Sequence, residues 1–428
     1  MYYIITALGC KVNQYEAQAV ETLLRARGFA PAAAGRPADV IVVNTCAVTA
    51  EGARKSRQAI RRLHEEQPGA LVAVCGCWSQ LSPEDAAAIG ADVVHGSGSK
   101  RAFVDDICRA LEGRETITCV DNPFRRMAFE PLPAGAASGR TRAMLKIQDG
   151  CSNFCTYCVI PYTRGRVRSL PPEEIRASAA ALEREGYREL VLTGIEIASY
   201  GADLAGGPTL ADAVRVAAEA APGLRLRLGS LEPTVVTEDF CRALAETGRV
   251  CDHFHLSLQS GCDRTLARMN RKYDTERFYA GVERLRRQFP GCALTADLIT
   301  GFPGETEADH AETLEFLRRC QFAAVHVFPY SRRPGTKADE LPEQLSHAVK
   351  NRRAHEVQRL AEETGQAFLQ VQPGRTLSVL FETERDGGWV GHAANYCLVR
   401  AAGDALRGVV RNVEITGVSG QMLVGNLV

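Results

Sequence analysis

Short apolar runs alternate with helical patterns over most of this chain, and that alternation limits the folds it can adopt. In residues 1–113 the runs YYIITAL, VIVVNT and LVAVCG are rich in β-branched residues and lie between polar turns, as strands do. The segments NQYEAQAVETLLRARG and AEGARKSRQAIRRLHEE between them carry apolar residues at helical spacing. Strands that alternate with helices usually pair in parallel. We therefore predict an α/β fold that begins with an open parallel sheet.

The alternation stops at a linker and then resumes. Residues 114–140 are rich in proline, glycine and small residues, which predicts a connection without long elements. From residue 141 to about residue 371, helical stretches separate six apolar runs, namely AMLKI, ELVLTG, RLRLGS, FHLSLQS, ALTADLITG and AAVHVFPY. Six strand–helix units predict a partial parallel barrel, (βα)6, and not the closed barrel of eight.

Residues 372–428 have a different pattern. The stretches LSVLFETE, WVGHAANYCLVRA, LRGVVRNVEITGVSG and MLVGNLV alternate apolar and polar residues and are separated by glycine turns. They predict a small antiparallel β-barrel, of the kind that binds RNA. This segment has no basic surplus, because its acidic residues equal its arginines in number.

The composition and the apolar pattern indicate the cellular compartment of the protein. The chain has 428 residues, a formal net charge of zero and 15 cysteines. Its sequence contains no run of about twenty apolar residues, and the start MYYIITALGCKVNQ lacks the pattern of a signal peptide. We therefore expect a cytoplasmic protein with no membrane partner. Cysteines rarely form disulfides in that compartment, so metal ligation or catalysis should account for some of them.

A neutral chain can bind a polyanion only through local basic patches. One candidate patch follows the cysteine motif described next and consists of Arg164, Arg166 and Arg168. The other lies on one predicted helix of the first domain and consists of Arg54, Lys55, Arg57, Arg61 and Arg62. Such runs are more often solvated faces than binding sites.

The most specific motif is QDGCSNFCTYCVIPYTRG, in which Cys151, Cys155 and Cys158 have the spacing CxxxCxxC. A structural zinc site wants four ligands in two pairs, and no second pair of this kind follows. Three neighbouring thiolates suit a 4Fe-4S cluster that leaves one iron open to another ligand. The motif follows the first strand of the predicted barrel, where chemistry belongs in such folds. A chance group of thiols in a loop is the alternative.

Three further cysteines each follow a predicted strand of the first domain: Cys10, Cys46 and Cys77. The carboxyl ends of parallel strands meet at one edge of a sheet. We therefore expect these thiolates to converge and to offer a second site for an iron–sulfur cluster. Cys77 is preferred over Cys75 because it lies past the strand end. The alternative is that all three are small buried residues.

Polar residues also follow the later strands of the predicted barrel. They could hold the amine, ribose and adenine of a nucleotide-like cofactor, although each alone could be an ordinary loop residue. The candidates are Gly194, Glu196, Ser230, Glu232, Gln259, Asp297 and Tyr330.

The CxxxCxxC spacing resembles that of the radical S-adenosylmethionine (SAM) superfamily, in which the open iron binds SAM. Together with GCKVNQYE, NTCAVT, GCWSQ, LTGIEI, LSLQSG, MNRKY and GFPGET, the chain resembles the methylthiotransferase family of radical SAM enzymes over its whole length. GCKVNQYE resembles the branch that acts on N6-threonylcarbamoyladenosine beside the anticodon of tRNA. Sister branches, which tend to differ around this first cysteine, act on N6-isopentenyladenosine in tRNA or on a ribosomal-protein aspartate.

The resemblance implies two 4Fe-4S clusters, SAM, and roles for particular residues. Cys151, Cys155 and Cys158 would hold the radical SAM cluster, and Cys10, Cys46 and Cys77 the second cluster. Arg271 in MNRKY would help to hold SAM, and residues 372–428 would form an RNA-binding TRAM domain.

The implied reaction is radical methylthiolation of carbon 2 of the adenine, with SAM also supplying the methyl group. The implied partners are the tRNA anticodon loop and an electron donor such as flavodoxin or ferredoxin, and the sulfur donor is left open. A reading from a different class is an RNA-binding protein with purely structural clusters. The open iron argues against that reading, because a structural site is usually closed by a fourth ligand.

Overall fold

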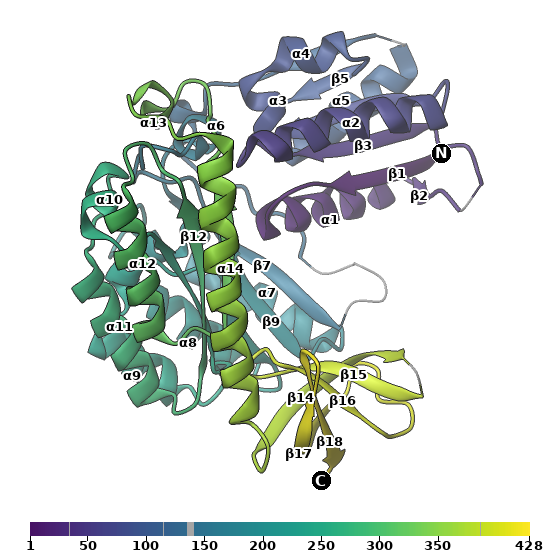
Figure 1. Ribbon diagram of the computed structural model, residues 1–428. Coiled ribbons are helices and arrows are strands. Elements are labelled where there is room, and N and C mark those ends of the chain that lie inside the picture. Colours follow the sequence, from purple (N-terminus) through teal and green to yellow (C-terminus); the bar gives the residue numbers. More distant parts are fainter. Residues whose placement is uncertain (34, 114, 135–140, 386) are drawn as a thin grey trace.

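The computed structural model describes residues 1–33, 35–113, 115–134, 141–385 and 387–428. The chain begins with a six-stranded parallel sheet in the order β2-β1-β3-β4-β5-β6 (Figure 1). The strands are β1 Tyr2–Ala7, β2 Ala30–Pro31, β3 Val40–Thr45, β4 Leu71–Gly76, β5 Val93–His95 and β6 Ile117–Cys119. The helices are α1 Lys11–Ala26, α2 Ala50–Glu66, α3 Cys77–Leu81, α4 Pro83–Ala88 and α5 Lys100–Gly113. Apolar clusters on both faces of β3 and β4 explain why VIVVNT and LVAVCG read as nearly continuous apolar runs.

The segment expected to be a linker contains two short elements. Strand β6 pairs in parallel with β5, and a 3-10 turn covers Pro123–Arg125. Burial of Ile117 against the first sheet explains the extra strand, which is too short to be recognised from its pattern. Residues 114 and 135–140 of the expected linker lie outside the described residues.

The central region contains six parallel strands, as expected from the six apolar runs. They are β7 Arg142–Asp149, β9 Glu189–Gly194, β10 Arg225–Leu228, β11 His253–Gln259, β12 Ala293–Thr300 and β13 Ala324–Pro329. Isolated parallel bridges, including Leu231 to Leu256, join the β10 side to the β11 side, so the strands curve into an open partial barrel. The two-residue strand β8, Arg168–Ser169, runs antiparallel to β7 at one edge.

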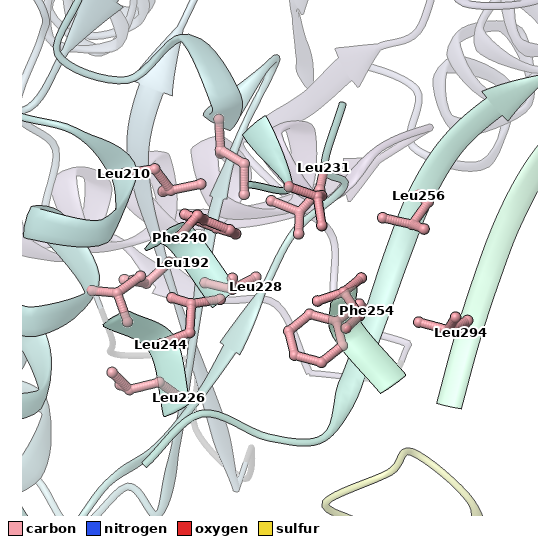
Figure 2. Close-up of a cluster of buried hydrophobic side chains, with 14 of the residues drawn as sticks. Leu192, Leu210, Leu226, Leu228, Leu231, Phe240, Leu244, Phe254, Leu256 and Leu294 are labelled. Atoms are coloured by element: carbon pink, nitrogen blue, oxygen red, sulfur yellow. The ribbon is translucent and has the colours of Figure 1, made fainter. Parts of the chain in front are cut away.

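The longer helices of this region cover the convex side of these strands, namely α7 Pro172–Arg184, α8 Leu210–Ala220, α9 Glu238–Glu246, α11 Thr275–Gln288 and α12 Glu307–Cys320. The short helices are α6 Ile160–Arg164, α10 Asp263–Arg268 and α13 Lys337–Glu340, and α6 contacts α3 of the first region. Figure 2 shows the core that results, in which leucines of β9 and β10 meet Phe240 and Leu244 of α9. Burying such side chains is the main stabilising contribution to this layer.

Helix α1 of the first region lies over part of the concave side. Met144 of β7 and Val191 of β9 belong to the same apolar cluster as Tyr15 and Val20 of α1. The first sheet and the partial barrel are therefore joined through a shared core.

The chain ends in a closed five-stranded barrel, reached by the long helix α14, His347–Gln370 (Figure 1). Its strands are β14 Thr376–Arg385, β15 Gly388–Ala393, β16 Leu398–Ala401, β17 Val410–Ser419 and β18 Met422–Leu427. Neighbouring strands are antiparallel except β16 and β18, which pair in parallel. The predicted α/β fold with a terminal, largely antiparallel barrel is confirmed.

A buried ionic cluster docks this barrel onto the central strands. Glu189 pairs with Arg225 at 2.6 Å and with Arg227 at 2.8 Å. The same arginines donate to backbone carbonyls of the barrel, Arg225 to His392 at 2.8 Å and Arg227 to Ala394 at 3.0 Å. Among the described residues, no helix is both long and apolar enough to cross a membrane.

Candidate active site: two cysteine triads

Cys151, Cys155 and Cys158, here called the loop triad, lie in the single loop between β7 and α6. Gly150 begins this loop with φ of 75°, and a Cβ atom there would stand 1.9 Å from the carbonyl oxygen of Arg166. Glycine is therefore required for the close approach of the two backbone segments. The amide of Cys151 donates to the carbonyl of Gly165 at 3.0 Å, which closes the loop.

Nitrogen donors surround the three sulfur atoms. Cys151 Sγ accepts from the amide of Asn153 at 3.5 Å, and Cys158 Sγ accepts from the amide of Ile160 at 3.4 Å. Cys155 Sγ accepts from Nη1 of Arg271 at 3.1 Å. Burial raises the pKa of Cys151 and of Cys158 to about 12. The three sulfur atoms accept hydrogen bonds, and burial disfavours free thiolates at Cys151 and Cys158. Both features fit ligands of a metal cluster, because a metal ion deprotonates the thiol that it binds and compensates the negative charge.

A second segment, Met269 to Arg271, holds the loop triad from the side. Asn270 has φ of 58° and donates through Nδ2 to the carbonyl of Phe154 at 3.0 Å. The amide of Thr156 donates to the carbonyl of Met269 at 3.1 Å. This segment is part of the MNRKY motif, which therefore helps to hold the loop of the loop triad in place.

Cys10, Cys46 and Cys77, here called the sheet triad, follow β1, β3 and β4. These strands are neighbours in the parallel sheet, so their carboxyl ends lie at one edge. Burial raises the pKa of Cys46 to about 11, and the charges of Cys77 and Cys10 add to the effect. The pKa of Cys10 is raised first by burial, and Cys77 again contributes. The three cysteines therefore lie at the same edge of the sheet.

Glycine makes room for this second triad. Gly9 has φ of 90°, and a Cβ atom there would lie 2.5 Å from the sulfur of Cys46. Cys46 Sγ accepts from the amide of Val48 at 3.5 Å. Cys75, by contrast, is fully buried inside β4 in the apolar core beneath the sheet, where burial raises its pKa to about 12.

One arginine links the two triads. The pKa of Cys158, raised first by burial, is raised further by Cys77 of the other triad. Between them lies Arg164, the last residue of α6, which is fully buried. Its Nε donates to Cys77 Sγ at 3.3 Å, and its Nη2 donates to Asn13 Oδ1 at 2.9 Å. The helix that follows the loop triad therefore delivers a cation to the sheet triad.

The prediction that Arg164, Arg166 and Arg168 form a surface patch for a polyanion is wrong for two of the three. Arg164 and Arg168 are buried, and only Arg166 is exposed. The reason is the pair of buried carboxylates that they neutralise, Glu16 of α1 and Asp149 of β7. Of the two patches predicted from sequence, the outer face of α2 is the one whose basic side chains are mainly at the surface.

This ionic network is cationic overall. Four cations meet two carboxylates, namely Lys100, Lys146, Arg164 and Arg168 with Glu16 and Asp149. Burial opposes ionisation of both carboxyls, but neighbouring cations outweigh it and hold the pKa of Glu16 and of Asp149 well below the ordinary range. The network therefore places surplus positive charge beside Cys77.

Four of the predicted SAM-binding residues gather beside the loop triad. Glu232 Oε1 lies 3.4 Å from Nη2 of Arg271 and has no hydrogen-bond partner among the described residues, while Oε2 accepts from Asn153 at 3.1 Å. The pKa of Glu196 is raised, first by burial and then by the charge of Glu232. Ser230 is exposed and its hydroxyl lies 3.1 Å from that of Ser257. Carboxylates with spare acceptor capacity fit the amine and ribose of a SAM molecule.

Three others line a cavity of about 210 Å³ in which the first region meets the partial barrel. Gln259 ends β11 with φ of 65° at a β-bulge, and Asp297 lies on β12. The hydroxyl of Tyr330 is buried without a partner among the described residues. The opposite wall includes Val48 and Thr49, which closely follow Cys46.

Gly194 has a different place from the rest. A Cβ atom there would stand 2.8 Å from the carbonyl oxygen of Gln148, so this glycine serves the close contact of β9 with β7. The remaining residues divide between the loop-triad group and the cavity. The chemistry of the described residues therefore fits two clusters and SAM: two sets of three thiols, and a carboxylate oxygen of Glu232 without a hydrogen-bond partner among them.

Several residues of the site were missed in the sequence. Asn153 and Ser257 contact predicted residues, and the first of them lies inside the cysteine motif itself. His255 Nε2 lies 3.2 Å from Asp297, and His326 lies beside both. Strand alternation could have found the histidines, because His255 and Gln259 share one face of β11.

Comparisons with known proteins agree with this arrangement. The family model described as the radical SAM superfamily matches residues 145–317, which include the loop triad. A second model, described as an uncharacterized protein family, UPF0004, matches residues 2–96, which include the sheet triad.

Curated relatives cover nearly the whole chain. The threonylcarbamoyladenosine tRNA methylthiotransferase MtaB of Bacillus subtilis is 38% identical over 92% of this chain and 88% of the relative. The enzyme of the same name from Thermotoga maritima is 36% identical over 88% and 86%. The tRNA-2-methylthio-N(6)-dimethylallyladenosine synthase of Sphingopyxis alaskensis is 36% identical over 90% and 88%.

Solved structures show the fold at greater distance. The radical SAM methyltransferase TsrM of Kitasatospora setae, with cobalamin and a [4Fe-4S] cluster bound, has a TM-score of 0.57 at 16% identity. The match covers 79% of this chain and 76% of that one. The cobalamin-dependent radical enzyme OxsB has a TM-score of 0.52 at 13% identity, over 85% and 56%.

Proposed function

Since the chain belongs to the family of radical SAM tRNA methylthiotransferases, we propose that it converts N6-threonylcarbamoyladenosine beside the anticodon of tRNA into its 2-methylthio derivative. The observation that carries this proposal is the link between two cysteine triads, because Arg164 follows the loop triad in α6 and donates to Cys77 of the sheet triad. A protein with purely structural clusters would not need acceptor-only carboxylates and a cavity beside them. The chain is thus a transferase, and its cofactors are two 4Fe-4S clusters and SAM.

The loop triad is the proposed site of the radical SAM cluster. With that cluster and SAM bound, the site supplies the radical chemistry that replaces a hydrogen on carbon 2 of the adenine. Arg271 donates to Cys155 and faces Glu232, so it fixes the position of the cysteine loop relative to this carboxylate. Glu196 and Glu232 are the proposed partners of the SAM amine and ribose, with Ser230 and Asn153 at their side.

The sheet triad is the proposed site of the second cluster, which would supply the sulfur chemistry when bound. Arg164 holds Cys77 and places that triad opposite the first. The cavity lined by Gln259, Asp297 and Tyr330 is the proposed space between them for cofactor and base. Its apolar walls, including Ile299 and Phe328, help to exclude water from a reactive intermediate.

The proposed roles divide along the chain. Residues 1–113 hold the second cluster, residues 141–371 form the radical SAM core, and residues 372–428 form a TRAM-like module for RNA. The anticodon loop suits such a site, because its bases can be splayed out of the helix. The proposed setting is the cytoplasm, where a flavodoxin or ferredoxin supplies the electron.

Purified full-length chain, reconstituted anaerobically with iron and sulfide, tests the proposal. It is incubated with SAM, a reductant and tRNA that carries threonylcarbamoyladenosine, and the nucleosides are analysed by mass spectrometry. The 2-methylthio derivative should accumulate and should require SAM. Product formed only on isopentenyladenosine, or only on a ribosomal protein, would assign the chain to a sister activity instead.

A further inference from the structure

Three exposed aromatic side chains, here called the ring cluster, meet beside the loop triad. Phe154 lies inside the cysteine motif, Tyr162 lies on α6, and Phe124 belongs to the turn Pro123–Arg125. Their ring centroids lie 6.5, 6.3 and 5.8 Å apart. Of the five exposed Phe and Tyr side chains in the described part of the chain, these three are in mutual contact, although each is 36–41% exposed. Apolar groups gathered at a surface in this way mark interaction sites.

The backbone holds the ring cluster in place. Gly165, directly after α6, packs so closely on the turn of Phe124 that a Cβ atom there would stand 2.0 Å from the carbonyl oxygen of Pro123. Phe154 has φ of 48°, which glycine adopts without strain and other residues usually avoid. A phenylalanine kept at such a position indicates a use for its ring.

Three cations border the ring cluster. Arg125 belongs to the same turn as the first ring, and Arg166 follows the tight glycine contact. Lys272 donates at 2.8 Å to the asparagine that holds the cysteine loop. All three are exposed and form no ion pair with another described residue. The acid on the same segment, Asp121, is already paired with Arg126. The surface around the rings is therefore cationic.

The ring cluster lies outside the region proposed for the RNA. Among the described residues, the cysteine loop contributes Tyr157 to the cavity of about 210 Å³, and none of the three rings lines it. Arg142 at the start of β7 pairs with Glu382 of the terminal barrel at 3.0 Å, whereas the cysteine loop follows Asp149 at the other end of β7. A strand of this length spans roughly 23 Å. Figure 1 shows α6 and the terminal barrel at opposite ends of the partial barrel.

The loop triad is the part of the site that an electron must reach from outside. Cys151, Cys155 and Cys158 are only partly buried, whereas Cys46 and Cys77 of the sheet triad are buried. Phe154 directly precedes Cys155, so a partner that covers the ring cluster lies against the loop that holds these thiols.

We propose that the ring cluster and its three cations form the docking site for an acidic electron-donor protein of the flavodoxin or ferredoxin class. This inference rests on the proposed function, because only a redox-active loop triad needs such a partner. The donor loses one electron, the cluster bound at the loop triad gains it, and no atom is exchanged. Aromatic side chains supply the contact area of a small interface, and the cations steer an acidic partner towards it.

Binding of a purified acidic flavodoxin, and in parallel of a ferredoxin, to the cluster-loaded full chain tests the docking site. Titration calorimetry compares wild type with two double variants, Phe124→Ser with Tyr162→Ser and Arg125→Glu with Arg166→Glu. Each double variant should raise the dissociation constant of the donor at least about tenfold. Added salt should weaken the binding of wild type and have little effect on the charge-reversed variant, because salt screens exposed charges.

A second measurement separates docking from damage to the loop. Formation of 5'-deoxyadenosine is driven either by the reduced donor protein or by dithionite, which needs no docking surface. The double variants should slow the first rate by about the same factor as they weaken binding and should leave the dithionite rate and the iron content unchanged. Arg184→Glu on α7 and Val371→Ser after α14 are exposed controls that should change neither binding nor rate.

The docking site and the proposed reaction fail in different ways. The docking site is refuted if wild type binds neither donor, if both double variants bind as wild type does, or if the dithionite rate falls as much as the donor-driven rate. Weaker binding of tRNA with unchanged binding of the donor would assign the ring cluster to RNA and refute it as well. If the variants lose the donor but wild type never methylthiolates the base, the docking site stands and the proposed reaction is refuted.

Discussion

The two cysteine triads use opposite ways of placing three thiols. The loop triad lies within eight consecutive residues, 151–158, and local turns fix its shape. The sheet triad joins positions 10, 46 and 77, and only the pairing of three parallel strands brings them together. The first depends on a loop and the second on the fold. Loss of packing in the first domain should therefore disturb the sheet triad before the loop triad.

The largest effect is expected from the loop triad. Replacing Cys151, Cys155 and Cys158 together by Ala should abolish 5'-deoxyadenosine formation, since no site for SAM cleavage is left. Iron analysis of reconstituted protein should fall from about eight atoms per chain to about four. A triple variant that still cleaves SAM under reducing conditions would show that the loop triad is not the radical site.

The sheet triad should give a separable loss. Replacing Cys10, Cys46 and Cys77 together by Ala should stop methylthiolation while 5'-deoxyadenosine still forms, and iron should again fall by about half. Cys75→Ala is the matched control, because this thiol points into the apolar core and should affect neither cluster. Undiminished methylthiolated product from the triple variant would remove the second cluster from the reaction.

The link between the triads can be cut at Arg164. Arg164→Leu leaves two buried carboxylates with less compensation, and breaking such buried pairs costs about 3–5 kcal/mol. The melting temperature should fall, and the iron of the sheet triad should be lost more readily than that of the loop triad. The exposed neighbour is the control, and Arg166→Leu should change stability little. Equal effects of the two variants would mean that Arg164 does not join the regions.

The smallest effect concerns pH and the docking of the terminal barrel. Burial opposes ionisation of Glu189, but Arg227 and Arg225 outweigh it and lower its pKa to about 2. A lowered pKa gives stability that is present above the ordinary value of 4.5 and is lost as pH falls towards 2. The difference in melting temperature between wild type and Glu189→Gln should thus be largest at neutral pH and should shrink in acid. A difference that is independent of pH would contradict this ionic account.

The sequence predicted those features that repeat or that follow from strand geometry. Six apolar runs marked six strands, and the position of Cys77 past a strand end distinguished it from Cys75. Both inferences depend on neighbouring residues alone. The short strand β6 was not predicted, because three residues are too few to show the alternation of apolar and polar residues that marks a strand.

Side chains that act across the fold were beyond such reasoning. Arginines are usually exposed, so Arg164 was placed at the surface. Its partners Glu16 and Asn13 precede it by roughly 150 residues, and nothing local announces their contact.

The hydrogen bonds from Arg225 and Arg227 to the barrel backbone also set the position of the barrel relative to the central strands. Because these arginines bind main-chain carbonyls of β15 and the turn after it, the barrel cannot swing freely on α14. If the barrel binds RNA, as proposed, the bound RNA lies at a set distance from the triads. The enzyme would then select its target base by the distance between the RNA bound to the barrel and the cavity, more than by the nucleotide sequence between these two points.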